Sequence, residues 1–155
     1  MITKTSNLLA AIVLVAVSLA YAQEASTLGQ KVFLDKKNKY FSMIPPAGWT
    51  QKDYEDNRTK VSWHNPGDER VLLRVIAREA VETYEELKRE VRGISAQWAS
   101  RGVILEESEV DLSGTPAIAL EGDLAEMGTI RLLFFISEDI HFNCQYAAPT
   151  RKLFD

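Results

Sequence analysis

The chain has few of the residues from which catalytic and metal sites are usually built. Its 155 residues include one cysteine, Cys144, and two histidines, His64 and His141. A single cysteine cannot close an internal disulfide, so the domain has to be stable through its hydrophobic core alone. These three residues cannot supply the two closely spaced ligand pairs of a structural zinc site, which argues against such a site. Cys144 alternates with apolar residues, and we interpret it as a small buried hydrophobe rather than a nucleophile.

The motifs of hydrolases and of phosphate-binding enzymes are also absent from the sequence. There is no Gly-x-Ser-x-Gly element, and the glycines are separate turn glycines rather than a phosphate loop. A serine-histidine-acid triad would need one of the two histidines. We expect His64, which precedes an Asn-Pro-Gly turn, to be solvated, and His141 to lie on the strand face away from the core. The sequence therefore predicts a protein that is not an enzyme.

Excess positive charge is lacking as well. The net charge is −4 at pH 7, which argues against nucleic acid or an anionic membrane as a partner. We expect Arg74, Arg78 and Arg131 to line one sheet face. Their expected role is pairing with Glu121 and Asp123, not clamping a ligand.

The longest apolar run is at the N-terminus and predicts export. Residues 8–20 are apolar apart from one serine, Lys4 precedes them, and Ala20 and Ala22 stand where a signal peptidase reads small residues. The run is shorter than the ~20 residues of a membrane span. We therefore predict a signal peptide over residues 1–22, no stable membrane insertion after its cleavage, and a periplasmic or extracellular protein.

The rest of the chain reads as one α+β domain. Residues 23–30 are polar and aperiodic, which predicts a flexible leader, and residues 31–155 form the domain. Alternating apolar residues predict strands at 31–34, 40–44, 59–64, 71–78, within 103–112, and at 116–124, 129–137 and 140–147. Residues 51–58 are polar and predict a loop or an irregular edge segment. Short turns between the strands predict a central antiparallel sheet of about six strands.

One amphipathic helix is expected to pack on this sheet. Thr83 and Glu86 have the spacing of a capping box, and Gly102 is a natural stop. Residues at three- and four-residue steps form its apolar stripe: Tyr84, Leu87, Val91, Ile94 and Trp98. We expect Gly93 to let the helix approach the sheet closely.

Residues 41–49 form the most distinctive motif of the chain, Phe-Ser-Met-Ile-Pro-Pro-Ala-Gly-Trp. The two prolines end a strand because they cannot donate to its ladder, the glycine permits a tight turn, and the tryptophan can cover one end of the core. We interpret the stretch as a structural signature. Its key residues are Phe41, Pro45, Pro46, Gly48 and Trp49.

These pieces, in this order, resemble the PsbP-like family, whose namesake is an extrinsic protein of photosystem II. The resemblance rests on residues 41–49, the capped helix of residues 84–101, the strand-turn-strand of residues 110–117, and the closing hairpin that ends at residues 146–148. It implies a sandwich built around an antiparallel sheet, usually exported and non-catalytic. The expected function is an interaction module that binds a protein partner or supports an envelope complex.

The sequence departs from this family at its C-terminus. Family members usually continue into a second helix that covers the sheet, and residues 149–155 read as its first turn, with Leu153 and Phe154 on an apolar face. We expect a truncated covering helix. A sheet face left bare in this way would favour self-association.

An alternative function is a carrier or sensor for a small ligand or a hard cation, and a secreted enzyme is the third. Asp53, Glu55 and Asp56 cluster in one polar segment, and calcium or manganese takes such oxygen ligands. A second acidic row alternates along one strand: Glu107, Glu109 and Asp111. Neither set matches an EF-hand loop, so we favour a solvated loop and a solvent-facing strand edge.

Overall fold

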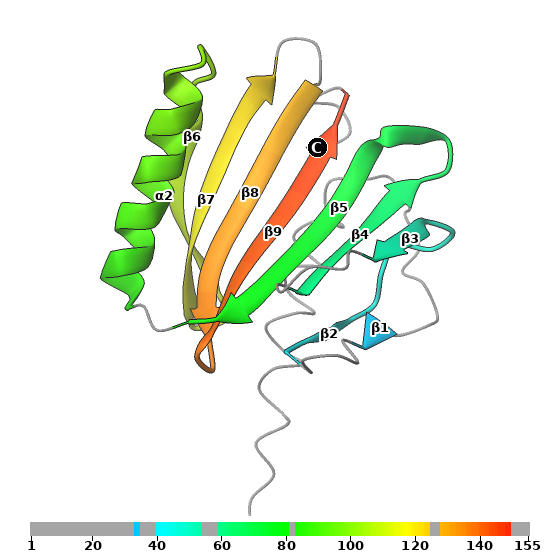
Figure 1. Cartoon of the computed structure of the whole chain (residues 1–155), viewed down its shortest axis with the longest axis horizontal. Helices are drawn as coiled ribbons and strands as arrows, with labels where there is room; N and C mark the ends of the chain where they lie inside the picture. Colours follow the sequence, from blue (N-terminus) through cyan, green and yellow to red (C-terminus); the bar gives the residue numbers. More distant parts are fainter. Residues whose placement is uncertain (1–32, 35–39, 54–58, 81–82, 125–127, 150–155) are drawn as a thin grey trace, which may run out of the picture.

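The computed structural model describes residues 33–34, 40–53, 59–80, 83–124 and 128–149. Its centre is a seven-stranded antiparallel sheet with one helix, α2, on one face and a short β1–β2 hairpin on the other (Figure 1). The predicted α+β class is confirmed. The predicted signal peptide (1–22), leader (23–30) and last six residues (150–155) lie outside the described residues.

The sheet follows the order β3-β4-β5-β9-β8-β7-β6, and every neighbouring pair is antiparallel. Its strands are β3 (Thr50–Asp53), β4 (Thr59–Asn65), β5 (Asp68–Glu79), β6 (Glu106–Leu112), β7 (Thr115–Leu124), β8 (Gly128–Ser137) and β9 (Ile140–Ala148). The sequence predicts about six strands, one too few, because residues 51–53 of β3 fall in the polar segment predicted to be a loop or irregular edge. Its four residues are all exposed, so pairing with β4, and not burial of alternate side chains, makes it a strand.

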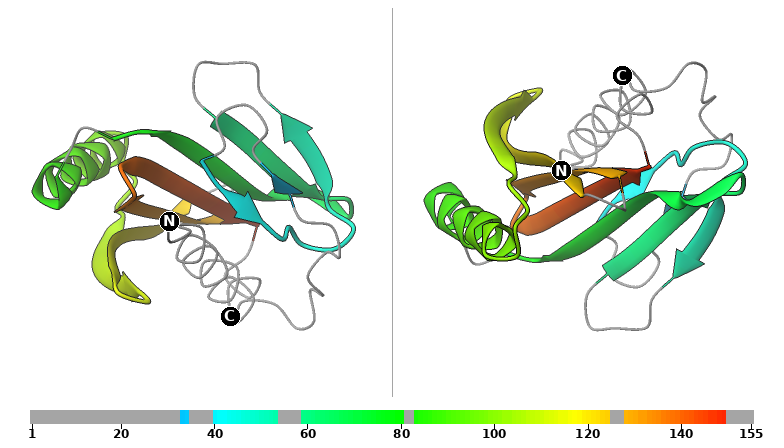
Figure 2. Two further views of the ribbon diagram at one scale, coloured as in Figure 1. Left: turned by 90° about the horizontal axis from the view of Figure 1, so that it is seen from below. Right: turned by 90° about the horizontal axis from the view of Figure 1, so that it is seen from above.

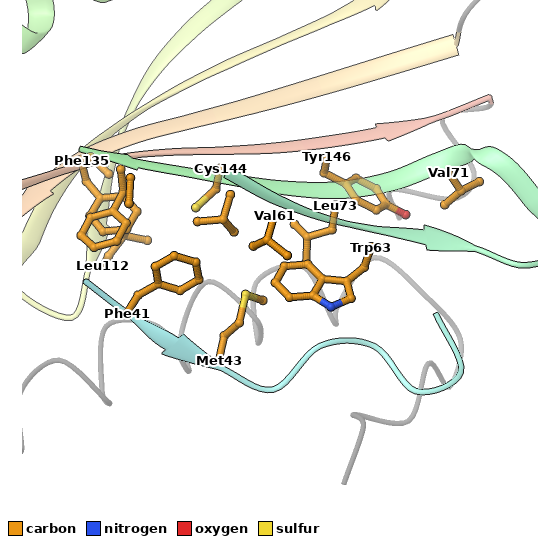
Figure 3. Packing of buried hydrophobic residues seen from close by; sticks show 14 of the residues in the cluster. Phe41, Met43, Val61, Trp63, Val71, Leu73, Leu112, Phe135, Cys144 and Tyr146 are labelled. Carbon is orange, nitrogen blue, oxygen red and sulfur yellow. The ribbon is translucent and has the colours of Figure 1, made fainter. Parts of the chain in front are cut away.

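The first core cluster lies on the face of the sheet that β2 (Ser42–Met43) covers. Alternate residues of β5 are buried there, as the sequence predicts: Val71, Leu73, Val75 and Ala77. Phe142, Cys144 and Tyr146 of β9 are buried opposite them in register. Figure 3 shows Cys144 and Tyr146 among the packed side chains. The rings of Phe135 and Phe142 stack with centroids 4.8 Å apart. We call this side the β2 face.

The signature of residues 41–49 supplies the cover of the β2 face. Phe41 and Met43 are buried, and the Phe41 ring meets Phe142 edge-on at 6.2 Å. Gly48 has a φ of 77°, which few other residues adopt readily, and Trp49 packs partly buried against the same cluster. β1 (Phe33–Leu34) pairs antiparallel with β2, which confirms strands within residues 31–34 and 40–44. The stretch acts as a structural element.

Helix α2 (Tyr84–Ala99) covers the opposite face, which we call the helix face. Thr83 and Glu86 form the predicted capping box, and Leu87 and Val91 are fully buried over β7 and β8. The remaining stripe residues pack partly buried against the second core cluster: Tyr84, Ile94 and Trp98. Gly93 is exposed, and a Cβ added there would meet nothing within 4 Å, so its expected role in close approach is wrong.

Among the described residues, no helix is long and apolar enough to cross a membrane.

Candidate functional site

The structure describes one of the three carboxylates predicted as hard-cation ligands. Asp53 is exposed at the end of β3, where its Oδ1 accepts a 2.9 Å hydrogen bond from Gln51 Nε2. Glu55 and Asp56 lie outside the described residues. Within the described ranges, no three His, Cys, Asp or Glu side chains group closely enough to hold a metal ion. The cation site stays a prediction.

The second acidic row, on β6, pairs with the helix. Lys88 Nζ lies 2.7 Å from Glu109 Oε1, and Arg92 Nε lies 3.9 Å from Glu107 Oε1. Asp111 instead accepts a 2.8 Å hydrogen bond from the backbone N–H of Gly114. The three carboxylates are exposed, as the solvent-facing interpretation expects, but two of them also tie β6 to α2. The sequence did not reveal this link because it is made across elements.

The contact between Lys88 and Glu109 stabilises the charged form of the lysine. The hydrogen bond to Glu109 raises the pKa of Lys88, against a smaller opposite effect of desolvation. Lys88 Nζ also lies 4.9 Å from the centroid of the Tyr84 ring, a cation–π geometry. Burial, with a contribution from the charge of Glu109, raises the pKa of the Tyr84 hydroxyl. At neutral pH the lysine is therefore charged and the tyrosine neutral.

The edge formed by β6 is the most distinctive surface of the described chain. β6 ends the sheet, and its described strand partner is β7 alone. Six of its seven residues are exposed. Two large apolar side chains among the described residues are exposed, Ile104 at 72% and Val110 at 40%, and both belong to this region. We call Ile104 together with Glu106–Leu112 the β6 edge.

A serine and a histidine of β4 form a hydrogen-bonded pair on the helix face. Ser62 Oγ lies 3.0 Å from His64 Nε2, and His64 Nδ1 lies 3.3 Å from the carbonyl oxygen of Glu69. His64 is half-buried, so it is only partly solvated. Strand alternation places residues two apart on one face, and this signal could have identified the pair.

The pair lacks the exposure that nucleophilic catalysis needs. Ser62 has none of its surface exposed, so a substrate carbonyl cannot reach Oγ in this conformation. His141 lies on the predicted strand face, away from the β2 cluster, and is buried with its ring centroid 6.4 Å from that of Phe134. His64 bonds a buried hydroxyl and a backbone carbonyl, and neither is an exposed nucleophile.

The three arginines do not share one face. Arg131 lies on the β2 face and pairs with Glu121, as predicted, at 2.8 Å from Nε to Oε2. Arg74 and Arg78 lie on the helix face, where Arg74 Nη1 is 3.5 Å from Gln145 Oε1 and Arg78 Nη2 is 2.9 Å from Glu90 Oε2. Asp123 accepts a 2.7 Å hydrogen bond from Thr129 Oγ1 and not from an arginine. Side chains alternate between the two faces along a strand. In β5 and β8 the odd-numbered residues, such as Arg131, point to the β2 face, and the even-numbered ones, such as Arg74, point to the helix face.

Cys144 lies in the core and is not a reactive thiol. Its burial raises the pKa of the thiol to about 12, so it is protonated at neutral pH. It lines an apolar cavity of about 20 Å³ between β2 and the sheet, with Phe41, Met43 and other apolar side chains around it (Figure 3). A cavity of this size holds about one water molecule, and its apolar lining offers a water no partner. It is too small for a metabolite.

Comparisons with family models and with curated proteins found no match to this sequence. Among solved structures, the chain is similar to cyanobacterial PsbP (CyanoP) from Synechocystis sp. PCC 6803, solved in solution. The two are 16% identical, with a TM-score of 0.57 over 81% of this chain and 82% of that chain. A crystal structure from Bacteroides thetaiotaomicron VPI-5482 is 18% identical and matches 79% of this chain and 42% of that one. Its TM-score of 0.45 supports no argument. At such identities the likeness concerns architecture alone, and on that basis the chain has a PsbP-like fold.

Proposed function

We propose that this protein is an exported, non-catalytic interaction module that binds a protein partner or supports an envelope complex. The observation that carries the proposal is the β6 edge. There, exposed apolar side chains, exposed carboxylates and the end of a sheet coincide. An exposed edge strand presents a row of backbone N–H and C=O groups with which another chain can pair.

The chemistry of the described residues supports the non-catalytic part of the proposal. A serine hydrolase needs an exposed serine beside its base, and Ser62, which has a histidine neighbour, is fully buried. The cysteine is buried and protonated at neutral pH. A serine-reactive fluorophosphonate probe should therefore leave the folded protein unlabelled, and stoichiometric labelling of Ser62 would contradict the proposal.

Export and partner binding are tested together in the organism that carries the gene. A photocrosslinking residue replaces Ser108 on the β6 edge, and in a matched variant it replaces Gln51 on the other edge of the sheet; both positions are exposed. We expect the mature chain to begin at Gln23 and a discrete protein adduct to form from position 108. A protein that stays in the cytoplasm, or that gives no adduct from either edge, would overturn the proposal.

A further inference from the structure

We propose that the β6 edge binds an extended, basic segment of the partner, which adds to the sheet as a further antiparallel strand. This inference rests on the proposed function and specifies the partner's chemistry. It is drawn from three properties of the edge: its backbone, its exposed apolar side chains and its charge.

Among the described strands, β6 pairs with β7 on one side, and no described strand pairs with its other side. An edge strand has one row of N–H and C=O groups facing away from its neighbour, and β7 is the neighbour here. β6 is seven residues long and contains no proline or lysine, two devices that commonly block edges. The opposite edge, β3, has only four residues. β6 is thus the longer template for strand addition.

Apolar anchors flank this backbone. Val110 points to the β2 face at the outer end of the sheet, in register with buried Ala117, and Ile104 lies two residues before the strand begins. Peptides that add to a sheet edge gain affinity from main-chain hydrogen bonds and specificity from alternate side chains. Figure 2 shows this end of the sheet curving away from the side on which α2 lies.

Charge selects a basic occupant over a second copy of this chain. Four carboxylates occupy the seven residues of β6: Glu106, Glu107, Glu109 and Asp111. The cations Lys88 and Arg92 of α2 reach two of them. Pairing β6 with the β6 of another copy would place carboxylates opposite carboxylates, which destabilises a strand pair. Lysine or arginine at alternate positions of the incoming strand would instead complement the edge.

Peptide binding tests the backbone and charge requirements separately. The probe is the capped peptide Lys-Val-Lys-Val-Lys-Val-Lys, measured by fluorescence anisotropy against the mature protein. One control peptide has glutamate in place of lysine. The other has N-methyl groups at alternate residues, which keep the charge and remove the donors of one edge. We expect binding of the unmodified basic peptide and at least tenfold weaker binding of both controls. No binding of the basic peptide, or equal binding of the N-methylated one, would overturn the inference.

Two variants locate the site. Val110→Lys puts a cation on the β6 edge, and Thr50→Lys puts one on the exposed β3 edge. We expect the first to weaken peptide binding at least tenfold and the second to leave it unchanged. Ser108→Lys, also at an exposed position, replaces Val110→Lys if that variant fails to fold. Equal binding by the β6 and β3 variants would overturn the inference.

Two results separate this inference from the proposed function. If the adduct from position 108 forms equally well in the Val110→Lys background, a partner exists but does not add a strand. If the purified protein is a dimer that Val110→Lys dissociates, the occupant is a second copy and the basic partner is refuted.

Discussion

Two identical glycine-to-alanine changes should have opposite effects on stability. Gly122 lies in β7 beneath the segment that leads into β6, and an added Cβ would lie 2.6 Å from the carbonyl oxygen of Ile104 and 2.7 Å from Leu105 Cδ2. The first of these atoms is backbone, so relief requires the start of β6 to move. Gly93 lies within α2, is exposed, and has space for a methyl group on every side.

The magnitudes follow from these surroundings. Overpacking a well-filled site costs about 1–3 kcal/mol, and the backbone contact in Gly122→Ala puts its cost at about 2 kcal/mol. Gly93→Ala should stabilise the protein by up to about 1 kcal/mol, the difference in helix propensity. With a urea slope of about 1.5 kcal/mol/M, the unfolding midpoint should fall by about 1.3 M for Gly122→Ala and rise by up to about 0.7 M for Gly93→Ala.

Urea unfolding followed by tryptophan fluorescence measures both changes, and an unchanged slope shows that only stability differs. A neutral or stabilising Gly122→Ala would refute the close crossing of residues 104–105 over β7. A destabilising Gly93→Ala would refute the exposed placement of that helix face.

Three further changes test the core, the thiol and the helix–strand link. Leu87→Ala, at a fully buried helix position, should cost about 3 kcal/mol, whereas Ile104→Ala should change the unfolding free energy by less than about 0.5 kcal/mol; similar costs would contradict the burial pattern. Cys144 should resist Ellman's reagent at pH 8 in the native protein and react fully in urea; rapid native labelling would contradict its burial. Lys88→Met should lower the urea midpoint at neutral pH. The raised pKa of Lys88 means that its pairing with Glu109 stabilises the fold below pH about 10.5 and is lost as pH rises through the higher folded value, so the difference from wild type should disappear above that range or in high salt. A difference that is insensitive to both would mean that packing, not charge, is responsible.

Sequence patterns were sufficient where one side of an element is buried. The alternation of residues 71–78 and 140–147 predicted the β5 and β9 side chains of the β2 face, although His141 on the other face is buried as well. The three- and four-residue steps of residues 84–98 predicted the packed side of α2, and the capping box predicted its start. Burial imposes these periods on the sequence, so they can be read back from it.

Patterns failed where pairing with a distant element decides the outcome. β3 has no apolar alternation, because both of its faces are exposed and its stability comes from β4. Arg78 pairs with Glu90 of α2 because β5 and the helix meet in space. The acidic row of β6 is exposed, as predicted, but its pairing with Lys88 and Arg92 depends on how the helix lies against the strand, which no local pattern encodes.

The sequence alone determined the α+β class, the helix and its packed side, and the alternating core of the central strands, because local periodicity reflects which side of an element is buried. The tertiary structure decided the strand order, in which β9 lies between β5 and β8 and β6 is left at the edge. Strand order depends on which distant segments form hydrogen bonds with one another, and no local pattern encodes that choice. The candidate site is a consequence of this order, since Ile104, Val110 and the β6 carboxylates form an edge only because the sheet ends there.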